Sequence, residues 1–354
     1  MIEAMPPADV DVGLAVAAQR LVEQSLVVVP GETVLIVYDA GHEDIAAVVI
    51  EAVREARSQP LAIRLEDLGP RPHASLDPRI AEAMGRAQAS LLIVDFHRGE
   101  LQMRSTMIDL AAQQRLRHGH MVGVARGSMV AGFSVDPGRI AQKSRELSVR
   151  LKPDARIIVR SGGAGSENDA AGSRERGDAE LVIRLAPRCR WVDYGCIVSS
   201  GKRVNLPGGE LVTSPESVDG VYVANGTLGD AEGALNRRLQ NTPITLRIAG
   251  SQVKAVECAS DPALARAVWD CVRRTPNLDR VGLVSFGVNV GLTTPIGDVF
   301  SDQKIPGVHL SLGDTFADAT GATWTSKSWI AFTSVEHDAD IDKTRVLRRG
   351  RYVF

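Results

Sequence analysis

The chain has 354 residues, of which 44% are hydrophobic and 24% are charged. This composition is typical of a globular protein and excludes a disordered or fibrous chain, and the length suits two ordinary domains. The 41 basic and 43 acidic residues are interleaved and give a formal net charge of -2. Because no strong positive field results, we expect neither a nucleic acid nor an anionic membrane surface as a partner.

Two further features of the whole chain concern its compartment and its redox state. The first residues contain no basic segment followed by an apolar core, and no apolar run reaches the length of a membrane span. We therefore expect a cytoplasmic protein. The cysteines follow no zinc or iron–sulfur spacing and are expected to stay reduced: Cys189, Cys196, Cys258 and Cys271.

The first 160 residues predict an α/β domain built on a parallel sheet. Short apolar runs alternate with amphipathic segments, which is the pattern of β-α-β units. The expected strands cover 34–39, 60–67, 89–96, 120–127 and 155–161, and the clearest helices cover 42–57 and 108–117. This order predicts an open, doubly wound, Rossmann-like sheet.

The turn from Asp39 to His42 follows the first predicted strand and opens the first predicted helix. Such a turn can present helix N-terminal amides to an anion. It lacks the G-x-G-x-x-G pattern of dinucleotide-binding turns, and every doubly wound domain needs connections of this kind. We therefore interpret it as an ordinary structural turn.

A change of character at 161–178 marks the predicted domain boundary. This segment is rich in Gly, Ser and charge and has no hydrophobic period, so we expect a flexible loop. From 179 to 354, strand-like runs are separated by turn residues, among them Asn225-Gly226, which suits a tight hairpin. Only 261–274 has a clear helical pattern. The second domain should be α+β with a largely antiparallel sheet.

Two residues of the second domain are candidates for acid–base chemistry. A Pro-Gly-Gly turn delivers Glu210 into a predicted strand, and His309 lies between apolar residues on another. Taken singly, a solvated strand-edge carboxylate and a satisfied core histidine are the simpler interpretations. The cluster EHDAD (336–340) is interpreted as a turn before a closing hairpin, since one His among adjacent carboxylates lacks convergent geometry.

Three segments carry a family resemblance in the same order along the chain. They are NLPGGELVTSP (205–215), SDQKIPGVHLSLG (301–313) and RVLRRGRYVF (345–354). They resemble three segments of the metallo-aminopeptidases of the aminopeptidase T and aminopeptidase S type, which are leucyl aminopeptidase-like. The first resembles the Asn-Leu-Pro turn of that family that ends in Glu, the second resembles its "xHIALG" strand block, and the third resembles its closing strand. The resemblance covers 181–354 well and implies a homodimer. The first domain agrees only in its α/β pattern.

The resemblance also implies that most of the metal ligands of that family are missing here. Glu210 matches the first glutamate ligand, and His309 matches the histidine of the "HIALG" strand. The other ligand positions fall on residues that do not bind divalent metals well: Ser285, Phe316, Trp329 and Ala331. The iron ligands of the related 2,5-dihydroxypyridine 5,6-dioxygenase are absent as well. We expect no two-metal centre, and at most one weak ion on Glu210 and His309.

These observations favour a hydrolase, or a related bond-cleaving enzyme, that acts on a small amide, peptide or ring substrate through Glu210 and His309 without metal. Two alternatives stay open. One is an aminopeptidase whose zinc, cobalt, manganese or iron is held by other ligands, for example His337, Asp338 or Asp340. The other is a non-catalytic binding protein of the same fold.

Further residues are expected to contact the substrate. The aromatic replacements Phe316 and Trp329 predict a drier pocket that favours a flat or apolar molecule. Arg203 or Lys304 could hold a substrate carboxylate, because each lies next to a segment that carries the resemblance or within it. Ser285 is expected to line the same pocket. As nucleophiles, Ser285 and Cys196 lack a demonstrated partner, so a structural role is the simpler interpretation.

Overall fold

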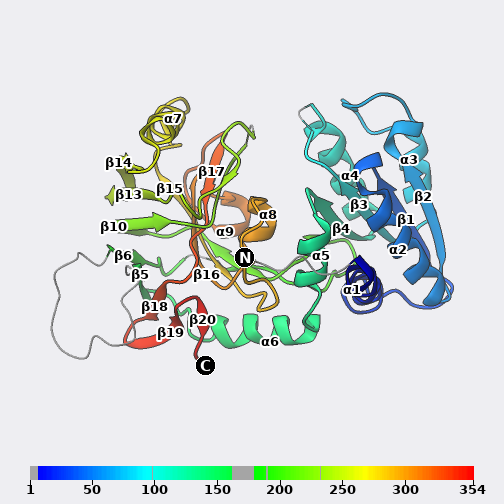
Figure 1. Ribbon diagram of the computed structural model, residues 1–354, viewed down its shortest axis with the longest axis horizontal. Coiled ribbons are helices and arrows are strands. Elements are labelled where there is room, and N and C mark those ends of the chain that lie inside the picture. Colours follow the sequence, from blue (N-terminus) through cyan, green and yellow to red (C-terminus); the bar gives the residue numbers. More distant parts are fainter. Residues whose placement is uncertain (1–6, 98, 162–178, 189, 232) are drawn as a thin grey trace. The chain divides into compact units, whose positions relative to one another are not determined.

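The computed structural model describes residues 7–97, 99–161, 179–188, 190–231 and 233–354, and its chain divides into two compact units (Figure 1). Unit 1 comprises Met1–Gln142 and Tyr194–Gly209. Unit 2 comprises Lys143–Asp193 and Glu210–Phe354. Each unit is therefore assembled from two separate segments of the chain.

This division differs from the boundary expected at residue 160. The strand at the end of the first predicted domain pairs within unit 2, and residues 194–209 return to add a strand to unit 1. Composition alone does not reveal such an exchange, because each segment carries the local pattern of the elements it forms. Of the loop predicted at 161–178, Ser161 is the last residue of a strand, and residues 162–178 lie outside the described residues.

Unit 1 contains a five-stranded parallel sheet in the order β2-β1-β3-β4-β8. Its strands are β1 (Thr33–Tyr38), β2 (Gln59–Arg64), β3 (Ala89–Val94), β4 (Arg117–Val122) and β8 (Arg203–Asn205). Its helices are α1 (Pro7–Arg20), α2 (Glu43–Glu55), α3 (Pro78–Met84), α4 (Leu101–Gln113) and α5 (Arg126–Gly132). Short helical turns cover η1 (Leu21–Ser25), η2 (Ala40–His42) and η3 (Leu65–Asp67).

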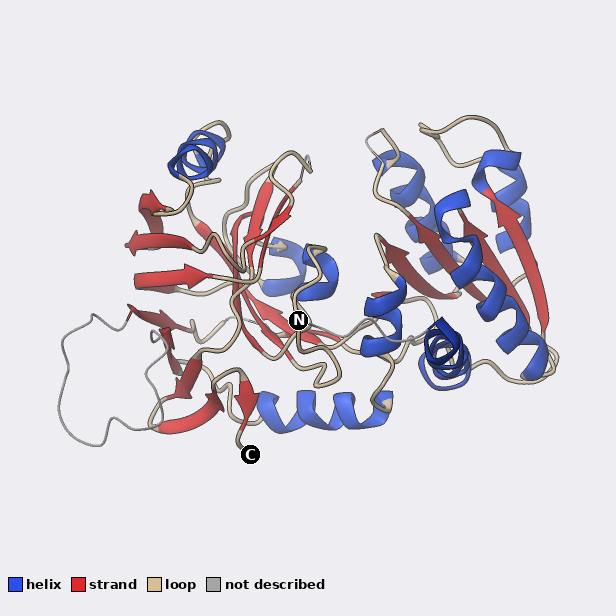
Figure 2. Cartoon of the chain, viewed as in Figure 1, coloured by secondary structure: helices blue, strands red, loops and turns tan. Residues whose placement is uncertain are grey.

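Helices cover both faces of this sheet (Figure 2). Successive residues of β1 point to opposite faces, so Val34 and Ile36 pack with α1 and α2, whereas Leu35 and Val37 pack with α3 and α4. A strand covered on both faces needs an unbroken apolar run, which is what the sequence shows there. The predicted doubly wound α/β unit is therefore confirmed.

Unit 2 is built mainly from two sheets whose paired neighbours run antiparallel. The eight-stranded sheet has the order β14-β13-β10-β6-β5-β18-β19-β20, and the seven-stranded sheet has the order β12-β11-β17-β16-β15-β9-β7. This arrangement confirms the expected α+β unit with largely antiparallel pairing. No helix in the described parts of the chain has the length and apolar character needed to cross a bilayer.

The strands of the eight-stranded sheet are β5 (Arg156–Ser161), β6 (Ala179–Arg184), β10 (Ser217–Ala224), β13 (Ile244–Ala249), β14 (Gln252–Glu257), β18 (Asp338–Ile341), β19 (Thr344–Arg348) and β20 (Arg351–Tyr352). Those of the seven-stranded sheet are β7 (Val192–Tyr194), β9 (Glu210–Thr213), β11 (Thr227–Asp230), β12 (Arg237–Arg238), β15 (Val281–Gly287), β16 (Gly307–Gly313) and β17 (Trp329–Phe332). The helices are α7 (Pro262–Val272), α8 (Val299–Asp302) and α9 (Ala317–Thr320), and α6 (Pro137–Ser148) spans the division between the units.

Two local expectations for unit 2 were wrong. Asn225-Gly226 does not close a hairpin, because β10 belongs to the eight-stranded sheet and β11 belongs to the seven-stranded one. The second is the EHDAD cluster, most of which is strand β18 and not a turn. The tight turn lies just after it, at Asp342 and Lys343, where β18 pairs with β19. Each segment also has a backbone partner that is distant in sequence: Gly226 donates to the carbonyl oxygen of Thr333, and β18 pairs with β5.

Candidate functional site

Glu210, Ser285 and His309 lie on three neighbouring strands of the seven-stranded sheet. Ser285 of β15 is directly opposite His309 of β16, and Glu210 of β9 is directly opposite Gly287 of β15. Residues opposite each other in an antiparallel pair share a face, and so do residues two apart on one strand. The register therefore brings together, on one face of the sheet, three of the residues that the sequence singled out.

A glycine on β15 lets a fourth residue reach this face. A side chain at Gly287 would overlap the carbonyl oxygen of Ile305, so the backbone at 304–305 passes directly over the strand at this point. This crossing delivers Lys304, whose Nζ donates a hydrogen bond to Oε2 of Glu210. Lys304 is 1% exposed and Glu210 is 6% exposed, so the two charges form a buried ion pair. Lys304 was expected to hold a substrate carboxylate, and in the structure it neutralises Glu210.

The imidazole of His309 is hydrogen bonded at both nitrogens. Nε2 lies 2.9 Å from the carbonyl oxygen of Ile305, and the backbone N–H of Ser334 donates to Nδ1 over 3.2 Å. A carbonyl only accepts, so this pattern assigns the proton to Nε2 of a neutral ring. Burial lowers the pKa of His309 to about 4, against the opposing effect of the Glu210 charge.

His337 is a buried neighbour of this site. Its burial beside His309 was not predicted from the sequence. Its Nε2 accepts a hydrogen bond of 2.8 Å from the backbone N–H of Val308, which leaves the proton on Nδ1. That Nδ1 is buried and has no hydrogen-bond partner among the described residues. A side chain at Gly307 would touch the rings of both His309 and His337, so this glycine allows the two rings to approach. Burial lowers the pKa of His337 to about 3.

The two aspartates of the EHDAD cluster are held by arginines. Asp338 accepts hydrogen bonds from the side chain of Arg345 and the backbone of Arg349, and Asp340 accepts from the side chains of Arg345 and Arg160. These contacts tie β18 to its neighbours β5 and β19. The cluster thus serves the pairing of the eight-stranded sheet.

Within unit 2, the structure does not bring Trp329 or Phe316 to Glu210. Trp329 pairs with Gly313, the last residue of β16, whereas His309 lies near the beginning of that strand. Phe316 lies beyond the same end of β16 and is 41% exposed. Arg203 belongs to unit 1, where it donates a hydrogen bond of 3.0 Å to the side chain of Asn205.

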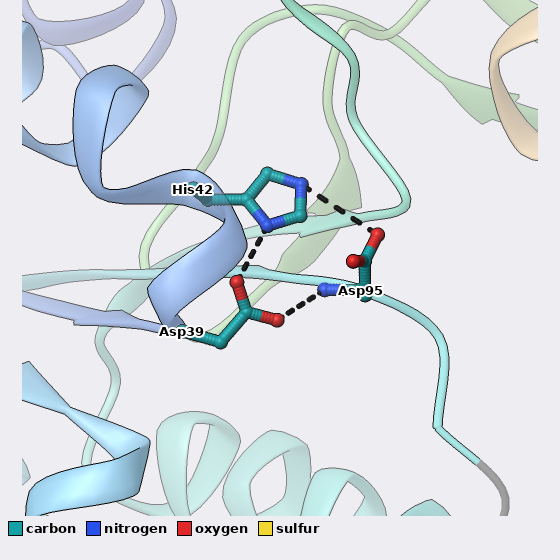
Figure 3. Close-up of side chains that lie close together, drawn as sticks. All are labelled: Asp39, His42 and Asp95. Atoms are coloured by element: carbon teal, nitrogen blue, oxygen red, sulfur yellow. Dashed lines mark hydrogen bonds and ion pairs between the residues drawn. The ribbon is translucent and has the colours of Figure 1, made fainter.

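A second cluster of titratable side chains lies in unit 1. Figure 3 shows the ring of His42 between the carboxylates of Asp39 and Asp95. Nδ1 of His42 lies 2.6 Å from Asp39, and its Nε2 lies 3.0 Å from the carbonyl oxygen of Val124 and 3.9 Å from the carboxylate of Asp95. Within the described residues, these are the three side chains whose ligand atoms lie close enough together to hold a metal ion.

Hydrogen bonds determine the charge state of this second cluster. Burial alone would raise the pKa of Asp39, but hydrogen bonds from His42, the Asp95 backbone and Arg71 outweigh it and lower the pKa to about 2. Arg71 also forms an ion pair with Glu100. Burial lowers the pKa of His42, whereas the hydrogen bond and charge of Asp39 raise it, and the net direction is upward. The sequence showed the turn from Asp39 to His42, yet nothing in it indicated that Asp95 lies alongside.

Comparisons with known proteins bear on the fold. No protein-family model matches the chain, and no curated protein matches it. Among solved structures, wild-type AmpT from Thermus thermophilus is similar, with a TM-score of 0.58, 16% sequence identity and coverage of 97% of this chain and 99% of that one. At this identity the likeness concerns the fold alone. The chain therefore has a mixed α/β, two-domain fold like that of AmpT.

Proposed function

We propose that this chain is a bond-cleaving enzyme of the aminopeptidase-like kind that acts on a small amide, peptide or ring substrate without a two-metal centre. Glu210 and His309 supply the acid–base groups, and Lys304 supplies a positive charge at Glu210. The observation that carries the proposal is the buried Glu210–Lys304 pair on the face that also bears His309. The AmpT-like fold and the sequence resemblance to aminopeptidases support the reaction class.

The Glu210–Lys304 pair is buried, and this limits what it contributes to stability. Desolvation cancels most of the attraction between two buried charges, so such a pair adds little net stability compared with an apolar pair of similar size. A buried carboxylate next to a cation is, however, a common arrangement at sites where protons move. In the proposed reaction, Lys304 takes the place of the positive charge that a metal ion would provide at Glu210.

In the proposed hydrolysis, Glu210 acts first as a base and then as an acid. Glu210 accepts a proton from a water molecule, and the resulting hydroxide attacks the carbonyl carbon of an amide. The carbon–nitrogen bond then breaks, and the proton held by Glu210 passes to the departing nitrogen. For His309 to participate, its Nε2–H must exchange the carbonyl oxygen of Ile305 for an atom of the substrate.

A second candidate function is binding without catalysis. It is favoured by the fact that Glu210 is neutralised by Lys304 while both nitrogens of His309 are bonded to the backbone. Two of the ligands named for the metal-dependent alternative, Asp338 and Asp340, give it no support, because both are bonded to Arg345. For either function, we propose a cytoplasmic homodimer that takes a small molecule or short peptide. Light scattering of the purified protein tests the dimer.

The experiment combines elemental analysis with a turnover screen. The full chain is tested on leucyl peptides with and without zinc, cobalt or manganese, and then on small amides and ring compounds. On any substrate that is turned over, Glu210→Gln and His309→Ala should each lower kcat at least about 100-fold. Glu257→Gln changes an exposed carboxylate on β14 and serves as the matched control. Unchanged kcat in both site variants would refute the mechanism, and tight binding without turnover would favour the second function.

A further inference from the structure

Asp39 and Asp95 occupy a particular place in the sheet of unit 1. Each directly follows a strand, Asp39 after β1 and Asp95 after β3, and these strands are parallel neighbours. The helix after β1 (α2) packs on one face of the sheet, whereas the helix after β3 (α4) packs on the other. The connections therefore diverge between β1 and β3. In open α/β sheets this switch point is where ligands bind, outside the carboxyl ends of the strands.

The surroundings of His42 require a positive charge at Nε2. Asp39 accepts the proton of Nδ1 and so sets the orientation of the ring. Nε2 then faces two groups that only accept, the carbonyl oxygen of Val124 and the carboxylate of Asp95. Either a proton or a metal ion can occupy the space between these acceptors. A carboxylate that holds the far nitrogen of a metal-binding histidine is a recurrent arrangement at metal sites.

The separations of these atoms suit a single divalent ion. Bonds from zinc or manganese to nitrogen and oxygen are about 2.1 Å long, so one ion can join two atoms up to about 4.2 Å apart. Nε2 of His42 lies 3.0 Å from the oxygen of Val124 and 3.9 Å from Oδ1 of Asp95. Both separations fall within that limit. The ion would take the place of the proton on Nε2.

Charge and access also favour a cation at this position. Arg71 forms ion pairs with Asp39 and Glu100 and donates a hydrogen bond of 3.1 Å to the backbone oxygen of Asp95, and no described residue donates a hydrogen bond to the carboxylate of Asp95. The side chain of Asp95 is 69% exposed, so an ion can reach it from solvent. Gly41 keeps space open beside the carboxylates, because a side chain there would lie 3.3 Å from Asp95 and 3.5 Å from Asp39.

We propose that Nε2 of His42, the carboxylate of Asp95 and the carbonyl oxygen of Val124 bind one divalent cation in unit 1. Asp39 orients His42, and water completes the coordination. One nitrogen and otherwise oxygen ligands suit Mn²⁺, Co²⁺ or Zn²⁺ better than a soft ion that prefers thiolates. The site belongs to unit 1, and its existence does not depend on the function proposed for Glu210.

The test uses the full chain after removal of metals with a chelator. Mn²⁺ is titrated and followed by electron paramagnetic resonance, with isothermal calorimetry as a second readout. The wild type should bind one ion per chain, with the pulsed resonance signal of a coordinated imidazole nitrogen. Asp95→Asn should weaken binding at least tenfold, whereas Asp109→Asn, which changes an exposed aspartate on α4, should leave it unchanged.

Glu210→Gln separates this site from the proposed active site and should also leave Mn²⁺ binding unchanged. Circular dichroism checks the fold of each variant, and His42→Asn replaces Asp95→Asn if the latter does not fold. The proposal is overturned if the wild type binds no Mn²⁺ saturably, if the bound ion shows no nitrogen coupling, or if the variants at 95 and 42 bind like the wild type. Loss of binding in Glu210→Gln with retention in Asp95→Asn would place the ion at Glu210 and would also overturn it.

Discussion

Replacing Lys304 by methionine should strongly destabilise unit 2, because it leaves Glu210 buried without its cation. Methionine has nearly the length of the lysine side chain and fills the same space without a charge. Lys304 is 1% exposed and Glu210 is 6% exposed, so water replaces little of the lost interaction. The change therefore isolates the electrostatic contribution of one group from the packing of the segment that carries it.

The size of the effect follows from the burial of the pair. Removing one partner of a buried ion pair typically costs about 3–5 kcal/mol, because the other charge is left buried without compensation. We therefore expect Lys304→Met to lower the free energy of unfolding by about 3–5 kcal/mol at pH 7.

Urea unfolding followed by tryptophan fluorescence measures this loss within the correct unit. All four tryptophans belong to unit 2: Trp191, Trp269, Trp324 and Trp329. Glu210→Met should cost a similar amount, whereas the double variant should unfold within about 1–2 kcal/mol of the wild type, because two apolar side chains then pack together. If each single change costs less than about 1 kcal/mol and the two losses add in the double variant, the pair is not coupled and the reasoning is refuted.

Three further changes test other features of the molecule. Tyr222→Phe removes a buried hydroxyl that lies 3.0 Å and 3.2 Å from two backbone carbonyl oxygens. In the same urea assay it should lower the free energy of unfolding of unit 2 by about 1–2 kcal/mol. No measurable loss would contradict this hydrogen bonding. Burial lowers the pKa of His118 from 6.5 to about 3, so below pH 6.5 the unfolded chain binds a proton that the folded chain does not. The free energy of unfolding should therefore fall by about 2 kcal/mol on going to pH 5. His118→Gln should remove that part of the decline in circular dichroism melts. If the stability of both proteins falls equally with pH, the decline does not come from His118. Gly287→Ala should lower the stability in thermal unfolding by at least about 2 kcal/mol, because its methyl group would overlap the carbonyl oxygen of Ile305. Gly127→Ala places its methyl group in open space and should be neutral. Similar melting of the two variants would count against the crossing at Gly287.

Short-range patterns in the sequence were sufficient to predict the fold class of both units. The apolar run at Val34 to Val37 predicted a strand covered on both faces, and the amphipathic run that follows predicted α2. The strands that begin at Glu210 and contain His309 were predicted in the same way. These features depend on neighbours only a few residues away, so the order of amino acids alone carries them.

Which sheet a strand joins depends on contacts between distant parts of the chain. Residues 156–161 have the pattern of the earlier parallel strands, yet they pair antiparallel with β6 and β18 in unit 2. Asn225-Gly226 suits a hairpin, yet the strands on its two sides belong to different sheets. The local pattern is the same in either case, and the free energy of tertiary packing decides between them.

In the two candidate sites, too, the sequence determined some features and the tertiary structure decided the others. The sequence by itself determined that Glu210 and His309 would each lie on a strand of the second domain, and that a turn would run from Asp39 to His42. Only the tertiary structure decided that Lys304 neutralises Glu210 and that Asp95 lies beside His42. Both pairings join residues more than 50 positions apart in the sequence, and they arise because the crossing over Gly287 and the pairing of β1 with β3 place those backbones side by side.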